Sequence, residues 1–293
     1  MPTRPQLLDC DNVSKLRQAV AEKDMCSLSS IPFTEISVGG LVELCCANHI
    51  WRELDDQIGI TAFDRIAVAI PALKTTYDRL LNAIHDPKHF QLRPTTDAFA
   101  VTAVARKDAF ADRSWSEFQQ SFVAVVKSAG FQPGFAVALS AAFGEIVENV
   151  PDHSASAASE MAAAIIGYCA TPGELHFAVG DVGRGLLSSL RENPRWATLE
   201  NSRQAIHATL LHAATRKVEH NEGTGFKLTL KSFVDRNGIL SVSSGDAVAR
   251  VGSDSEGRRV VSGFAPSLQG TRVAATCFIT GVPTENGIPQ LSI

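Results

Sequence analysis

The sequence predicts a protein of the α/β (α+β) class built from two parts. Between residues 36 and 84, strand-like and helix-like apolar segments alternate, which is typical of a small α/β unit. Further along, two apolar segments flank a turn at 171–174 and predict a β-hairpin that ends near Asp181. The chain has 293 residues and 45% hydrophobic content, which is enough for two domains and a sizeable core.

We predict an N-terminal α/β domain over residues 1–108, a second domain over 109–281 and a loosely held tail over 282–293. The first domain begins with a short strand at 36–38, a turn at Gly39 and Gly40, and a helix that reaches about Trp51. The remaining elements expected before residue 108 are a buried strand at 65–71, a helix at 77–84 and a strand at 99–104.

The second domain is expected to start with a helix at 114–128, followed by an apolar helix from Phe135. Because proline lacks an N–H group and clashes with the preceding turn, Pro151 predicts that this helix kinks or stops near Val150. The hairpin follows, with strands from 160 to 170 and from 175 to 181. The later expected elements are a helix at 201–214 and strands at 238–243, 247–251, 259–261 and 270–279.

Composition narrows the class of protein. A net charge of −4 argues against general nucleic-acid binding, which needs clustered Lys and Arg. The sequence has no apolar stretch of about 20 residues and no signal-peptide pattern at its start. Its six cysteines form no Cys-x-x-Cys pair and its histidines have no ligand spacing, so we expect free thiols, no transition metal and a cytoplasmic location.

Three short motifs occur in a fixed order. Glu145 and Asn149 are four residues apart on a predicted helix, so both side chains lie on one side of it. The sequence Asp181-Val-Gly-Arg-Gly185 directly follows a predicted strand, and its glycines allow close approach of the backbone to a ligand. The third motif, Gly223-Thr-Gly225, opens another predicted helix at 226–234, where free N–H groups can meet phosphate oxygens.

With these motifs the chain resembles the Bergerat-fold (GHKL) ATP-binding domain, over about residues 131–281. DNA gyrase and histidine kinases share that domain, and the anti-sigma-factor serine kinases are close relatives. The resemblance implies an α/β sandwich with a mixed, mainly antiparallel sheet. It departs from the family at Pro151 and in the third motif, which reads Gly-Thr-Gly-Phe-Lys227.

The resemblance implies a role for each matching residue. Glu145 would be the general base, Asn149 would ligate Mg²⁺, and Asp181 would accept a hydrogen bond from the adenine amino group. The backbone and side chains that would line ATP are those of Gly183, Gly185, Gly223, Thr224, Gly225, Lys227 and Thr271. Residues 186–222 occupy the place of the family's ATP lid, in which Arg216 and Lys217 could reach phosphates or simply face solvent.

The chemistry of phosphoryl transfer is consistent with these assignments, because it needs positioning and charge neutralisation more than covalent catalysis. Mg²⁺ prefers oxygen ligands and keeps several waters, so one amide oxygen plus nucleotide phosphates is a plausible set of ligands. A carboxylate one helical turn from that amide can reach an attacking hydroxyl or water.

Three functions remain open at this level. The first, which the retained Glu145 favours, is a signalling ATPase or protein serine/threonine kinase of the anti-sigma type. The second is a histidine kinase-like protein, for which His49 is the only candidate phosphoacceptor, without a matching second helix. The third is a nucleotide-gated interaction module without useful catalysis.

The resemblance also bears on partners and on the N-terminal part. Besides ATP and Mg²⁺, it implies a regulatory protein partner and allows a homodimer, with no membrane partner. Residues 1–108 faintly resemble the STAS-type domains of anti-sigma systems; the alternative is a generic extension that packs on the ATP-binding domain.

Overall fold

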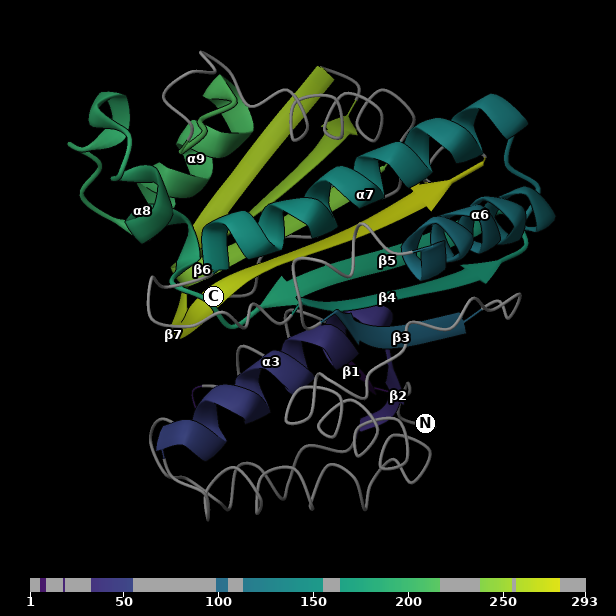
Figure 1. Ribbon diagram of the computed structural model, residues 1–293, viewed down its shortest axis with the longest axis horizontal. Helices are drawn as coiled ribbons and strands as arrows, with labels where there is room; N and C mark the ends of the chain where they lie inside the picture. Colours follow the sequence, from purple (N-terminus) through teal and green to yellow (C-terminus); the bar gives the residue numbers. More distant parts are fainter. Residues whose placement is uncertain are drawn as a thin grey trace.

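The structure is a computed structural model that describes residues 6–8, 18, 33–54, 99–104, 113–154, 164–216, 238–254 and 257–279. Its centre is a five-stranded sheet with strand order β3-β4-β5-β7-β6 (Figure 1). All of its described pairings are antiparallel. The strands are β3 (Phe99–Val104), β4 (Ala164–Thr171), β5 (Glu174–Asp181), β6 (Ile239–Asp254) and β7 (Gly257–Phe278).

Helices cover both faces of this sheet (Figure 1). α6 (Arg113–Ser128) and α7 (Pro133–Ser154) lie on one face, and α3 (Val38–Leu54) packs against β4, β5 and β7 from the other. A separate parallel pair joins β1 (Gln6–Leu8) to β2 (Phe33–Ile36). The α+β class is confirmed.

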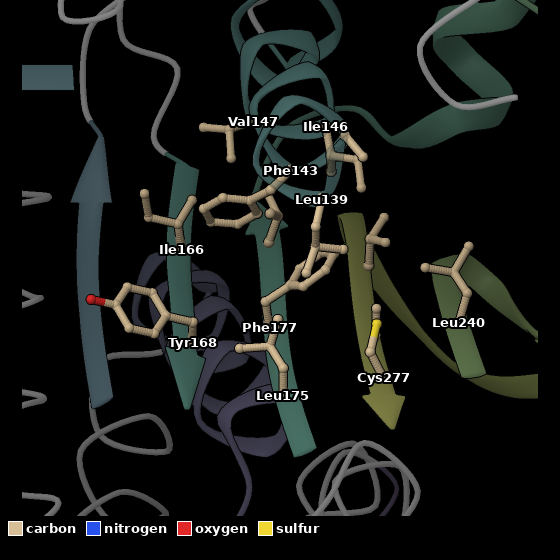
Figure 2. Close-up of a cluster of buried hydrophobic side chains, with 14 of the residues drawn as sticks. Leu139, Phe143, Ile146, Val147, Ile166, Tyr168, Leu175, Phe177, Leu240 and Cys277 are labelled. Carbon is tan, nitrogen blue, oxygen red and sulfur yellow. The ribbon is translucent and has the colours of Figure 1, made fainter. Parts of the chain in front are cut away.

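The hydrophobic core between the sheet and α7 is rich in aromatic rings. Phe122 stacks on Phe143 at 4.9 Å between ring centroids, and Phe143 meets Phe177 edge-on at 5.1 Å. Figure 2 shows Leu139 and Phe143 of α7 reaching toward strand residues such as Ile166 and Phe177. Alternate residues of β5 point to opposite faces of the sheet, and Leu175, Phe177 and Val179 all belong to this core. The odd-numbered residues of β5 therefore face α7.

Small residues let α3 approach the opposite face closely. A Cβ on Gly180 would lie 2.7 Å from Val42 and 2.8 Å from Cys46 of α3. A Cβ on Gly39 of the helix itself would lie 3.2 Å from the Cβ of Ala274 on β7. Gly39 and Gly40 are part of the first turn of α3, so the turn predicted for them is wrong. At Gly39 the lack of a side chain serves helix–sheet packing.

The helix that carries Glu145 and Asn149 does not stop at Val150. α7 continues through Pro151 to Ser154. Proline removes one hydrogen bond of the helix and crowds the preceding turn, but Val147 and Val150 in the same turns are buried in the core. Packing therefore outweighs the local proline signal, and the predicted stop is wrong.

The last four predicted strands are two long ones. β6 and β7 form a single hairpin in which Asp254 pairs with Gly257. An irregularity replaces the predicted breaks: residues 265–267 of β7 lie opposite Asp246 alone, and the register shifts on both sides of Gly245. A β-bulge of this kind bends a strand without ending it. Its position next to the end of β5 matters for the candidate site.

Other expectations are confirmed or fall outside the described residues. β3, α6, the 171–174 turn and the end of β5 at Asp181 agree with the sequence prediction. The strand at 65–71, the helix at 77–84 and the tail lie outside the described residues. β3 and α3 come from the predicted N-terminal part yet pack on the sheet of the second part. None of the described helices is long and apolar enough to cross a membrane.

Two glycines with open space around the Cβ position give a matched test of the backbone. Gly173 in the β4–β5 turn has φ +83° and open space around its Cβ position, whereas Gly134 in α7 has equally open space and no positive φ. We expect Gly173→Ala to lower the free energy of unfolding by about 1 kcal/mol, because L residues are strained at that φ. Gly134→Ala should be neutral or stabilising by up to about 1 kcal/mol. Urea unfolding of both variants measures this, and equal effects would contradict it.

Candidate functional site

The candidate site is built around Asp181, the last residue of β5. It is an odd-numbered residue of that strand, so by the alternation of side chains it lies on the α7 face of the sheet. The C-terminal end of α7 lies at the same end of the molecule (Figure 1). Helix α8 (Gly185–Leu190), which begins four residues after Asp181, contacts α7. Asp181 and Asn149 thus share one face and one end of the sheet.

The Asp181 carboxylate is buried and held by backbone N–H groups. Only 6% of the residue is exposed. The N–H of Gly183 donates to Oδ1 at 2.7 Å, and the N–H of Thr271 donates to Oδ2 at 3.2 Å. Each carboxylate oxygen can accept more than one hydrogen bond. The carboxylate therefore keeps acceptor capacity beyond these two bonds.

Burial raises the pKa of Asp181 from 3.8 to about 6. The hydrogen bond from Gly183, the positive charge of Arg272 and the hydrogen bond from Thr271 oppose this rise, in that order of size. The carboxyl group is ionised at neutral pH and becomes protonated in mildly acidic solution. A carboxylate kept in a dry place is costly, and such groups are frequent at functional sites.

This shift predicts how folding stability depends on pH. Because the folded-state pKa of about 6 lies above the ordinary 3.8, the folded protein keeps a proton that the unfolded chain has lost between these values. The stabilising contribution of protonated Asp181 is fully present below about pH 4 and is lost as pH rises through about 6. We therefore expect the stability of the wild type relative to Asp181→Asn to fall over this range in urea unfolding. A flat difference would contradict the buried, ionising carboxylate.

Two glycines with positive φ bring the chain against Asp181. Gly270 has φ +91°, and a Cβ there would lie 2.0 Å from the carbonyl oxygen of Asp181. Gly185 has φ +77° and starts α8. The hydroxyl of Ser244 connects both segments, because it accepts from the N–H of Leu186 at 2.9 Å and donates to the carbonyl of Gly270 at 3.1 Å. The side chain of Thr271 also reaches Ser244, at 3.3 Å.

Glu145 and Asn149 lie on the same side of α7. Glu145 is exposed and Asn149 is half-buried, whereas the side chains of Ile146, Val147 and Val150 face the core. Within the part of the chain that the structure describes, neither Glu145 nor Asn149 has a hydrogen-bond or ion-pair partner. The neighbouring Glu148 differs, since it accepts from the indole N–H of Trp115 at 3.3 Å. Glu145 and Asn149 are therefore polar groups of α7 that are available to a ligand.

The segment expected to form a lid contains short helices joined by turns over its described residues. α8, the short 3₁₀ helix η3 (Pro194–Trp196) and α9 (Ser202–His212) follow one another, and both α8 and α9 contact β6. The guanidinium groups of Arg184 and Arg216 both bind Glu192, the second at 3.3 Å. Here Arg216 faces a carboxylate of its own segment. Lys217 lies outside the described residues.

The structure does not describe the third motif. Gly223, Thr224, Gly225 and Lys227 lie outside the described residues. Among the described residues no group of three or more His, Cys, Asp or Glu could hold a metal ion. The four described cysteines are free, as expected, and three of them are buried.

Sequence reasoning missed a buried ion pair beside the site. Arg272 of β7 donates to Glu43 of α3 at 3.1 Å on the α3 side of the sheet, and both residues are less than 5% exposed. A signal was present in the sequence, because each is a lone charge in an otherwise apolar segment. Such charges are seldom buried unless they are paired. Ser244 carried no comparable signal.

Comparisons of the chain with protein-family models, with curated proteins and with solved structures find no match. The function is therefore inferred from the residues and their geometry.

Proposed function

We propose that this chain binds Mg·ATP in the manner of the Bergerat-type domains that its motifs resemble. The observation that carries the proposal is the Asp181 carboxylate. It is buried at the end of β5, is ionised at neutral pH and has spare acceptor capacity. A purine amino group would satisfy that capacity in a dry pocket, where an unfilled acceptor is costly. A guanine oxygen at the same place would meet the carboxylate as a second acceptor, so adenine is favoured.

The backbone around Asp181 supports a flat ligand there. The N–H of Gly183 donates to the carboxylate, the lack of a side chain at Gly185 lets the start of α8 lie against Ser244 and Gly270, and Gly270 lets β7 lie close to Asp181. Asp181 itself lies on the face of the sheet that α7 covers. The residues of the third motif would continue the pocket toward the phosphates, at the start of the helix predicted from residue 226.

The residues present fit a magnesium ion bound together with the nucleotide. The amide oxygen of Asn149 is a hard ligand, and phosphate oxygens with water complete the usual set for Mg²⁺. When bound, the ion neutralises charge on the phosphates. Glu145, one helical turn away and exposed, would take the proton from the attacking hydroxyl or water.

The reaction class follows from Glu145. Binding alone needs no base, so we propose a signalling ATPase or a protein serine/threonine kinase of the anti-sigma type, with a regulatory protein as its partner. A nucleotide-gated module with negligible turnover is the alternative. The two differ in one assay: the purified protein is incubated with γ-labelled Mg·ATP, and the label is followed. Release as phosphate, or acid-stable label on a protein, supports the enzyme. Label that stays on bound ATP supports the module, and no retained label with no turnover contradicts ATP binding.

A further inference from the structure

Arg272 lies next to the irregular, bent part of β7. The preceding residue, Thr271, donates to the Asp181 carboxylate. The Nη1 of Arg272 donates to the carbonyl of Gln269 at 2.5 Å, and its Nη2 donates to the carbonyl of Leu268 at 3.3 Å. Both carbonyls belong to the irregular part of β7, where Leu268 pairs with Gly245 and the regular ladder is interrupted. Leu268 is buried, and a buried carbonyl that leaves a ladder needs another donor. The guanidinium supplies it and thereby fixes the bend.

The same bend presents the N–H of Thr271 to the Asp181 carboxylate. Arg272 follows Thr271 directly and pairs with Gly180, the residue before Asp181. A Cβ on Gly180 would lie 3.1 Å from Cγ of Arg272. Arg272 and Asp181 are thus neighbours on adjacent strands, and they attract each other electrostatically.

Helix α3 completes the arrangement from the other face of the sheet. Glu43 binds Nε of Arg272 at 3.1 Å, and Val42 and Cys46 press on Gly180. A buried guanidinium is held in one place when a carboxylate and two carbonyls occupy three of its donor directions. Helix α3 therefore reaches the surroundings of Asp181 through the contact of Glu43 with Arg272 and through Val42 and Cys46 against Gly180, although it lies on the other face of the sheet.

We propose that Glu43 and Arg272 are positioning residues for Asp181, and that through them helix α3 sets how readily the Asp181 carboxylate accepts a hydrogen bond. The part of this inference that concerns ATP rests on the proposed function. Arg272 keeps Thr271 in place and favours the ionised carboxylate by its charge. Glu43 anchors the guanidinium and offsets part of that charge. A partner or a modification that lifts α3 from the sheet would alter the purine site without touching it.

The charged and titratable groups on the elements around Asp181 set the direction of the test. Among the described side chains they include Arg272 on β7, Glu43 and Cys46 on α3, Arg184 before α8 with its partner Glu192, and Glu145 and Glu148 on α7. Glu43→Gln removes one negative charge and keeps an oxygen for Nε of Arg272. The remaining positive charge should then favour ionised Asp181 and lower its pKa. Arg272→Met should raise that pKa.

The experiment is a ¹³C NMR titration of the Asp181 carboxyl in the full chain, assigned with Asp181→Asn. We expect Glu43→Gln to lower the pKa of Asp181 by about 0.5 unit or more. The control is Glu117→Gln, which removes a carboxylate from the exposed pair with Arg113. In this variant the pKa of Asp181 should equal the wild-type value. An unchanged pKa in Glu43→Gln overturns the inference. Arg272→Met should raise the pKa of Asp181 if that variant folds. If it does not fold, the result for Glu43→Gln alone decides the inference.

Binding of Mg·ATP to the same proteins connects the inference to function. Below the pKa of Asp181, a lower pKa leaves more carboxylate ionised, so at about pH 5.5 Glu43→Gln should bind ATP about twofold more tightly than the wild type. At pH 7.5 the two should bind alike. If the wild type bound no ATP, the proposed function would be wrong. The NMR titration would still decide whether α3 controls the pKa of Asp181.

Discussion

Asp181→Asn is expected to weaken Mg·ATP binding by about 100-fold. A hydrogen bond to a charged group contributes up to about 3 kcal/mol, and each 1.4 kcal/mol corresponds to a tenfold change in affinity. The amide keeps the size of the side chain but loses the charge, and one of its two polar ends can only donate. That end would face either the N–H of Gly183 or the N–H of Thr271, both of which need an acceptor.

Isothermal titration calorimetry with Mg·ATP at pH 7.5 measures this loss. Glu117→Gln is the matched control, because it removes a carboxylate from an exposed ion pair on α6 and should bind ATP as the wild type does. Circular dichroism checks that Asp181→Asn is folded. If folded Asp181→Asn bound Mg·ATP as tightly as the wild type, Asp181 would not be part of an ATP pocket, and every proposed function would lose its basis.

Glu145→Ala is expected to leave ATP affinity within about twofold and to lower the rate of phosphoryl transfer by 100-fold or more, since a general base contributes on the order of 10²–10⁴-fold. Glu145 is exposed on α7 and does not contribute to the core. Its removal should therefore change neither the fold nor the nucleotide pocket at Asp181. The rate is measured as release of labelled phosphate and as label transferred to protein.

Glu148→Ala is the control for this prediction. Glu148 is another exposed carboxylate of α7, but it binds the indole of Trp115. Its loss should leave the rate of phosphoryl transfer unchanged. If Glu145→Ala turned over ATP as fast as the wild type, Glu145 would not be the base, and the nucleotide-gated module would become the better proposal.

Local patterns predicted the elements whose signals agree with their packing. α6, the β4–β5 hairpin and the delivery of Asp181 at the end of β5 follow from apolar periodicity and turn residues. The failures are places where tertiary contacts outweigh local preference. Pro151 lies inside α7 because Val147 and Val150 anchor the helix in the core.

For a related reason, the sequence predicts several short strands where the structure has the long β6–β7 hairpin. Gly245 and Gly270 predict breaks between strands, because glycine with positive φ is frequent in turns. In the structure both have positive φ but lie within one continuous, bent hairpin. The ion pair of Glu43 and Arg272 could not be paired from sequence, because the two residues are 229 positions apart. Only the fold shows that α3 crosses the strand ends where Asp181 lies.

The central claim is that Asp181 recognises the amino group of adenine, and binding of inosine triphosphate tests it most directly. This nucleotide has the same sugar, phosphates and ring shape, but it has an oxygen in place of the amino group. We expect the wild type to bind Mg·ATP at least about tenfold more tightly than Mg·ITP, because a carboxylate cannot share a hydrogen bond with that oxygen. In Asp181→Asn this preference should disappear. Equal affinity of the wild type for the two nucleotides would contradict the role given to Asp181.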